Sequence, residues 1–150
     1  MPFAVTHILA PLLLVAIIRD FFLKKNKKKF SLHYVLIAGI AGILPDIDIV
    51  AFWILHFLGF TFEQIHKTFM HSIFIPIIFL ILFLALKNVN TKARICNIGR
   101  HKLKLNIIFL MFTIGISTHL ALDVLFEPVA LFYPLSASKF GATIQEYLPE

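Results

Sequence analysis

Four long apolar segments, separated by charged or polar stretches, dominate the chain. They run from about Phe3 to Leu23, Leu32 to Phe60, Phe69 to Leu86 and Leu105 to Phe126. Each is close to the ~20 residues that an α-helix needs to cross a bilayer, with allowance for tilt. The pattern predicts an all-α, polytopic membrane protein with about four transmembrane helices in a compact bundle. Residues 1–150 are expected to form a single membrane domain, with the tail from about 137 to 150 outside the bundle.

The composition agrees with this class. Hydrophobic residues make up 59% of the chain and charged residues 15%, against ~45–50% and ~25% in an average soluble domain. The single cysteine, Cys96, excludes an intramolecular disulfide and a cysteine-based zinc cluster. The first segment lacks the pattern of a secretory signal, because its positive charges follow the apolar stretch and no A-x-A-like site ends it. We therefore expect it to be a retained helix.

The basic residues are distributed very unevenly. Twelve of the 14 lie at the end of the first segment, in the loop after it, or in the loop between the third and fourth segments. The positive-inside rule places both loops in the cytoplasm, so the N-terminus and the C-terminal tail face outward. We expect an inner (plasma) membrane location and no direct nucleic-acid partner, although the net charge of +6 would suggest one in a soluble protein. The lysine run at 24–29 is read as a topology anchor, with a lipid-headgroup site as the alternative.

Seven polar residues stand within or beside the apolar segments. They are His7, Asp46, Asp48, His66, His71, His119 and Asp123. A charged Asp in a span costs about 2.5–3.5 kcal/mol on insertion scales, so three unpaired ones would cost roughly 9 kcal/mol, comparable to the stability of a domain. Only Lys67 offers a basic group at their depth, so simple ion pairs cannot satisfy them. Four imidazoles and three carboxylates could instead share divalent metal, with zinc preferred and manganese or iron as alternatives.

Their depth supports one shared site. Distances from the cytoplasmic end of each segment follow from a rise of 1.5 Å per residue. They are about 21 Å for Asp46, about 22 Å for His119, about 24 Å for His71 and about 25 Å for His7. Four segments thus bring candidates to one level, near the outer edge of a ~30 Å hydrocarbon core. The metal site is expected near the extracytoplasmic face.

Local spacing also favours a common site. His119 and Asp123 are four residues apart and share one helix face. Pro45 breaks the second segment, which allows both Asp46 and Asp48 to reach inward. His66 is expected on the outer loop and His71 in the first turn of the third helix. Beside the candidate histidines stand two hydroxyl residues, Ser72 and Thr118. We expect these to support the site through capping or local hydrogen bonds more than through substrate contact.

Four blocks of the sequence resemble a known family. They are THILAP (Thr6 to Pro11), GILPDIDI (Gly42 to Ile49), HKTFMHS (His66 to Ser72) and THLALDVLFEPVALFYPLS (Thr118 to Ser136). In this order they are similar to the membrane-bound metal-dependent hydrolases, also described as LexA-binding, inner-membrane-associated hydrolases. The resemblance implies a multi-helix inner-membrane protein with a metal site and hydrolase activity. It would also imply a regulatory link to LexA, although an outward-facing site argues against a direct one.

The chain departs from the family pattern in one block. Lys67 stands where the family often has Arg, and Thr68 where it often has Gly. Lysine keeps the positive charge but lacks the bidentate fork that suits phosphate. The H-x-x-x-D pair is also similar to helix pairs of zinc-dependent phospholipase C and S1/P1-type nucleases, which favours phosphoester chemistry.

The preferred interpretation is a hydrolase with two metal ions. Seven candidate ligands exceed the three that a single catalytic zinc uses, and ions ~3.5–4 Å apart would activate a water and clamp the substrate oxygens. Asp46 or Asp48 could act as general base, and Lys67 could attract an anionic, including a lipid-linked, phosphoester. One alternative is a metal-ion or proton transporter, but the inner halves of the segments have few polar residues. Another is a structural or regulatory protein whose helices are held together by metal.

Overall fold

Helices build almost all of the architecture. The computed structural model describes residues 4–26, 30–66, 68–88, 92–93 and 103–141. The α-helices are α1 (Ala4–Asn26), α2 (Leu32–Ala41), α3 (Asp48–Leu55), α4 (Phe62–Ile65), α5 (Phe74–Ala85) and α6 (Leu105–Phe126). Two 3-10 helices, η1 (Leu44–Ile47) and η2 (His56–Leu58), flank α3. Strands β1 (Lys92–Ala93) and β2 (Leu103–Lys104) form a short antiparallel pair before α6, which the sequence did not predict.

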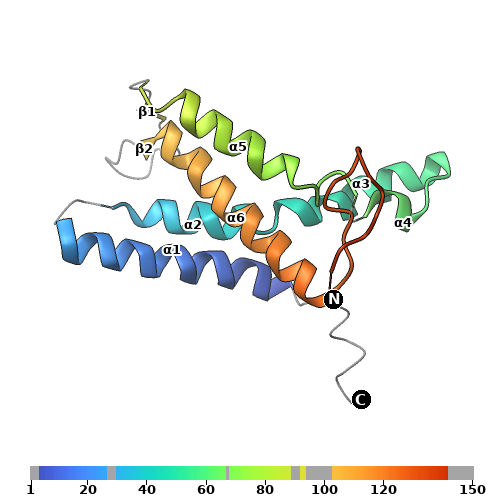
Figure 1. Cartoon of the computed structure of the whole chain (residues 1–150), viewed down its shortest axis with the longest axis horizontal. Coiled ribbons are helices and arrows are strands. Elements are labelled where there is room, and N and C mark those ends of the chain that lie inside the picture. The colour runs from blue at the N-terminus through green and yellow to red at the C-terminus, as the bar shows by residue number, and fades with distance from the viewer. Residues whose placement is uncertain (1–3, 27–29, 67, 89–91, 94–102, 142–150) are drawn as a thin grey trace, which may run out of the picture.

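Helix α6 is the centre of the bundle. It packs against α1, α2 and α5, and α1 and α2 lie side by side (Figure 1). The largest buried apolar cluster joins these helices near the start of α6, and it includes Val15, Val35, Ala38, Ile108 and Met111. Strands β1 and β2 mark one end of the molecule, while α3 and α4 lie at the other (Figure 1). The bundle therefore has an apolar core at the end where the basic loops attach.

Among the described residues, two helices, or three if a bent pair counts as one, are long and apolar enough to cross a bilayer, so the predicted four spans are not confirmed. Val5–Lys24 of α1 and Leu105–Phe126 of α6 are long and apolar enough, and the second segment counts as a third span only if its two halves, bent by 47°, are taken together. Helix α5 has only 12 residues, about 18 Å of helix, which is well short of a ~30 Å core. It begins at Phe74 because the preceding residues form a turn around His71.

Pro45 explains the bend in the second segment. Helix α2 ends at Ala41 with Gly42 as its C-cap, and Pro45 lies at the start of η1. Proline has no N–H to donate, and its ring clashes with the carbonyl four residues earlier. The predicted break at Pro45 is therefore confirmed, and it places Asp46 on η1 and Asp48 at the start of α3.

Two glycines allow the helices to approach closely. A Cβ atom on Gly115 would lie 2.6 Å from the carbonyl oxygen of Ala38 and 2.6 Å from Cβ of Ala41. A Cβ atom on Gly42 would collide with the carbonyl oxygen of His7 and lie 2.7 Å from Cγ of Pro11. Small residues at such crossings are typical of helices packed within membranes. The backbone of Gly42 is thus in direct contact with the segment that carries His7.

The close contact at Gly42 gives the first testable prediction. Gly42→Ala would force α1 and α2 apart, at a cost of about 1–3 kcal/mol for an overpacked site. Gly39→Ala is the matched control, since its added Cβ would approach Leu12 no closer than 3.4 Å. We expect thermal unfolding in detergent to show a melting temperature lower by several degrees for Gly42→Ala and little change for Gly39→Ala. Equal stability of the two variants would contradict the close packing.

Candidate metal centre

The candidate residues predicted from the sequence meet in one buried cluster. They come from α1, η1, the start of α3, the residue after α4, the turn before α5 and the last turns of α6. In chain order they are His7, Asp46, Asp48, His66, His71, His119 and Asp123. Six of these are between 0% and 8% exposed, while the side chain of Asp46 is 24% exposed. The structure brings these side chains together, as the spacing predicts, and His71 lies three residues before α5 and not in its first turn.

Three of the ligand atoms form a close triangle, and a fourth lies near two of them. The Nε2 atoms of His71 and His119 are 3.2 Å apart. Oδ2 of Asp123 lies 3.3 Å from Nε2 of His71 and 3.2 Å from Nε2 of His119. Oδ1 of Asp46 lies 3.6 Å from each of the same two nitrogens. Ligand atoms around a tetrahedral ion with bonds of about 2.0–2.2 Å are about 3.3–3.6 Å apart, so the triangle of His71, His119 and Asp123 has the size of three corners around a zinc-like ion.

Hydrogen bonding fixes which nitrogen of each ring faces the middle of this triangle. Nδ1 of His119 lies 2.6 Å from the carbonyl oxygen of Gly42, and a carbonyl only accepts, so Nδ1 carries the proton. Nε2 of His119 then presents a lone pair to Nε2 of His71. Two imidazole nitrogens 3.2 Å apart are held either by an N–H···N hydrogen bond, with the proton on Nε2 of His71, or by a metal ion bound between them.

Asp48 faces the Nδ1 side of the His71 ring, whereas Asp46 faces its Nε2 side. Its Oδ2 is 3.2 Å from Nδ1 of His71, and its Oδ1 is 2.9 Å from Nδ1 of His66. A carboxylate on the far nitrogen of a metal-binding histidine fixes the orientation of the ring and raises its basicity. Asp48 therefore has the geometry of a supporting residue for His71.

His7 approaches the cluster from the side opposite His66. Its Nε2 lies 3.5 Å from Oδ1 of Asp123, and its ring lies on that of His119 with centroids 4.1 Å apart. His7, His119 and Asp123 form a second group close enough to hold a metal ion, beside the group of Asp46, His71 and His119. The two oxygens of Asp123 face different histidines, as in a carboxylate that bridges two ions.

Several buried polar atoms support the interpretation as a cation site. Nδ1 of His7, Nε2 of His66, Nδ1 of His71 and Oδ2 of Asp123 make no hydrogen bond with any of the described residues. A buried polar atom without a partner costs about 1–3 kcal/mol. Three buried carboxylates also carry negative charge that a divalent cation would balance. The residues present therefore fit a metal ion.

Two further predicted residues, Ser72 and Thr118, direct their hydroxyl groups at backbone carbonyls. Ser72 donates a hydrogen bond to the carbonyl of Tyr133 at 2.7 Å, and Thr118 donates to the carbonyl of Ile114 at 2.7 Å. Both bonds fix backbone beside a candidate histidine, which agrees with the expected local role. Lys67 lies outside the described residues. Sequence reasoning missed the carbonyl of Gly42, which only the close approach of α2 and α6 brings to His119.

Metal content gives the second testable prediction. The purified full chain is expected to contain about one or two divalent ions, and His71→Ala is expected to lose them because it removes a central ligand. His56→Ala is the matched control, since His56 is exposed on η2. Elemental analysis would measure the ions, and a chelator should lower the melting temperature of wild type but not of His71→Ala. Equal metal content in wild type and His71→Ala would contradict the site.

Comparison with known proteins places the chain in a family. No curated protein and no solved structure matches it. The sequence model of a family described as YdjM inner membrane protein matches residues 1–148, which is nearly the whole chain. This is the same family that the four sequence blocks resemble. The chain therefore belongs to the YdjM family of inner membrane proteins.

Proposed function

We propose that this protein is a metal-dependent hydrolase of the inner membrane that acts on phosphoesters. The observation that carries the proposal is a set of three close ligand atoms beside one accessible carboxylate. His71, His119 and Asp123 would hold the ion, and Asp46, whose side chain is 24% exposed, lies next to the position left for water. A purely structural ion needs no such opening, whereas a catalytic site needs room for substrate.

A second ion would use the other side of Asp123. Oδ1 of Asp123 faces His7, while its Oδ2 faces the two central histidines. His7 and His119 would complete that second position together with Asp123. Zinc suits this set of nitrogen and oxygen ligands best, with manganese or iron as alternatives. When bound, such ions lower the pKa of a water molecule and polarise phosphoryl oxygens.

Residues of the chain would supply the proton transfer, the positioning of His71 and the attraction of the substrate. In the proposed reaction a water oxygen bonds to phosphorus, the P–O bond to the alcohol breaks, and the alcohol oxygen gains a proton. Asp46 is the accessible base that can accept the proton from water. Asp48 has both oxygens directed at histidines, so we assign it to positioning His71. The position of Lys67 beside His66 in the sequence favours attraction of the anionic substrate.

A structural metal site is the second candidate function. The cluster joins α1, η1, α3, the turn before α5 and α6, so an ion there would hold the bundle together. In that case removal of metal would destabilise the protein, but the metal-loaded protein would turn over no phosphoester. The third alternative, transport, has less support because the buried polar cluster is confined to one end of the bundle.

Hydrolysis gives the third testable prediction. Metal-loaded protein is expected to hydrolyse 4-nitrophenyl phosphate or bis(4-nitrophenyl) phosphate, and the two substrates separate monoesterase from diesterase activity. Asp46→Asn should lower kcat by about 100-fold or more, in the range for loss of a general base. Asp20→Asn is the matched control, because Asp20 is exposed and pairs with Arg19 far from the cluster. Turnover equal to that of metal-free protein would contradict the proposed activity.

We also propose that the cluster faces the extracytoplasmic side of the membrane. The cluster lies near the C-terminal end of α6, whereas Lys104 and the β1–β2 pair lie at its N-terminal end (Figure 1). The basic loops that favour the cytoplasm are therefore at the opposite end of the bundle from the cluster.

Orientation gives the fourth testable prediction, and the single cysteine makes it simple to test. Cys96 lies between β1 and β2 in the basic loop. In intact spheroplasts a membrane-impermeant maleimide should leave Cys96 unlabelled, because the loop is cytoplasmic. The control carries Cys96→Ser with Ser138→Cys, in the exposed segment after α6, and it should be labelled. The reverse pattern would invert the proposed orientation.

A further inference from the structure

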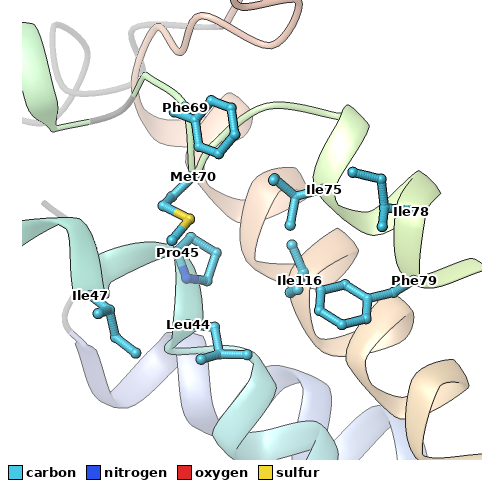
Figure 2. A pocket seen from close by; sticks show the side chains of 9 residues that line it. All are labelled: Leu44, Pro45, Ile47, Phe69, Met70, Ile75, Ile78, Phe79 and Ile116. Atoms are coloured by element: carbon cyan, nitrogen blue, oxygen red, sulfur yellow. The ribbon is translucent and has the colours of Figure 1, made fainter.

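An apolar pocket lies directly beside the candidate metal centre. Its volume is about 320 Å³, and its lining consists of apolar side chains from η1, the turn before α5, α5 and α6 (Figure 2). A pocket of this size is within the range of about 300–1,000 Å³ that is typical of sites for small ligands. Water filling it would find few polar partners among these side chains, so hydrocarbon is the better occupant.

Three stretches of chain contribute residues to both the pocket and the cluster. Pro45 and Ile47 line the pocket on either side of Asp46. Met70 lines it immediately before His71, and Ile116 lines it one helical turn before His119. The wall of the pocket is therefore continuous with the ligands of the centre.

The two ends of the pocket differ in character. Ile116 is 1% exposed and forms its floor (Figure 2). Ile47, Phe69 and Ile78 are between 44% and 56% exposed and lie around its mouth. In a protein embedded in a bilayer, apolar side chains exposed in this way face lipid. Asp46 stands in the sequence between two pocket residues, Pro45 and Ile47, and its side chain is 24% exposed.

We propose that the pocket holds the hydrocarbon chain of the substrate, which makes the substrate a lipid phosphoester that enters sideways from the bilayer. The proposal rests on the proposed hydrolase function. With its chain between η1 and α5, such a lipid would place its phosphate at Asp46. The carboxylate of Asp46 repels a phosphate group unless a divalent cation lies between them. Chain binding is therefore expected without metal, but phosphate-dependent binding only with it.

A pair of isoleucines on α5 provides the test. Ile78→Trp would fill the mouth of the pocket, whereas Ile81→Trp, one turn further along α5, adds the same ring at an exposed position outside the pocket. Hydrolysis of decyl 4-nitrophenyl phosphate is compared with that of methyl 4-nitrophenyl phosphate, using the metal-loaded full chain. Native mass spectrometry in parallel measures retention of decyl phosphate, decanol and inorganic phosphate with and without zinc.

We expect wild type and Ile81→Trp to prefer the decyl ester in kcat/KM by about tenfold or more, which corresponds to the burial of about two methylene groups. Ile78→Trp should lose this preference, so that its kcat/KM for the decyl ester falls to about that for the methyl ester, whereas Ile81→Trp should keep the wild-type kcat/KM for both esters. With zinc, wild type and Ile81→Trp should retain decyl phosphate more strongly than decanol, and Ile78→Trp should not.

The two proposals fail in different ways. Hydrolysis of both esters at equal rates by wild type would leave the hydrolase function standing and overturn the role of the pocket. The pocket proposal is also overturned if zinc-loaded wild type retains decanol as strongly as decyl phosphate. The pocket would then bind any lipid chain without recognising the phosphate. No hydrolysis of either ester, with zinc-dependent retention of decyl phosphate that Ile78→Trp abolishes, would support the lipid site and remove the hydrolase function.

Discussion

Burial of three carboxylates and four imidazoles at one end of an apolar bundle is the constraint on which the rest of the structure depends. Each of these groups would be costly at membrane depth without a partner. The chain satisfies them with one another, through contacts of 2.9–3.6 Å between carboxylate oxygens and histidine nitrogens. The Nε2 atoms of His71 and His119 lie close enough to share either a hydrogen-bonding proton or a metal ion.

The irregular parts of the fold serve this cluster. The second segment breaks at Pro45 and delivers two carboxylates, and the turn before α5 delivers His71. Irregular backbone at membrane depth is tolerated where it is buried within protein. Ser72 fixes the turn by its bond to the carbonyl of Tyr133, so the segment after α6 also supports the site. Gly42 and Gly115 bring the helices close enough for the carbonyl of Gly42 to accept the proton of His119.

Much of this arrangement could be predicted from local sequence. The bounds of α6 match the fourth apolar segment, the break at Pro45 follows from proline chemistry, and the common depth of the candidates follows from helix rise. The shortening of the third segment to α5 could not be predicted, since Phe69 and Met70 are as apolar as a spanning helix requires. The different roles of Asp46 and Asp48 also depend on tertiary structure, because both follow the same proline and only their partners separate them.

The apolar pocket and the polar cluster together describe a site at the boundary between lipid and a cation. Asp46 stands between them and is the accessible carboxylate of the cluster. In the proposed function, this position is the reason to favour membrane-borne phosphoesters over soluble ones. The chain's membership in the YdjM family of inner membrane proteins agrees with a protein that meets lipid.

The central claim is that the cluster binds a metal ion through imidazole and carboxylate groups. X-ray absorption spectroscopy at the metal edge of the purified full chain tests it most directly. The account predicts nitrogen and oxygen ligands alone at about 2.0–2.2 Å, with imidazole scattering that weakens in His119→Ala. A spectrum without imidazole scattering, or one that His119→Ala leaves unchanged, would contradict the account.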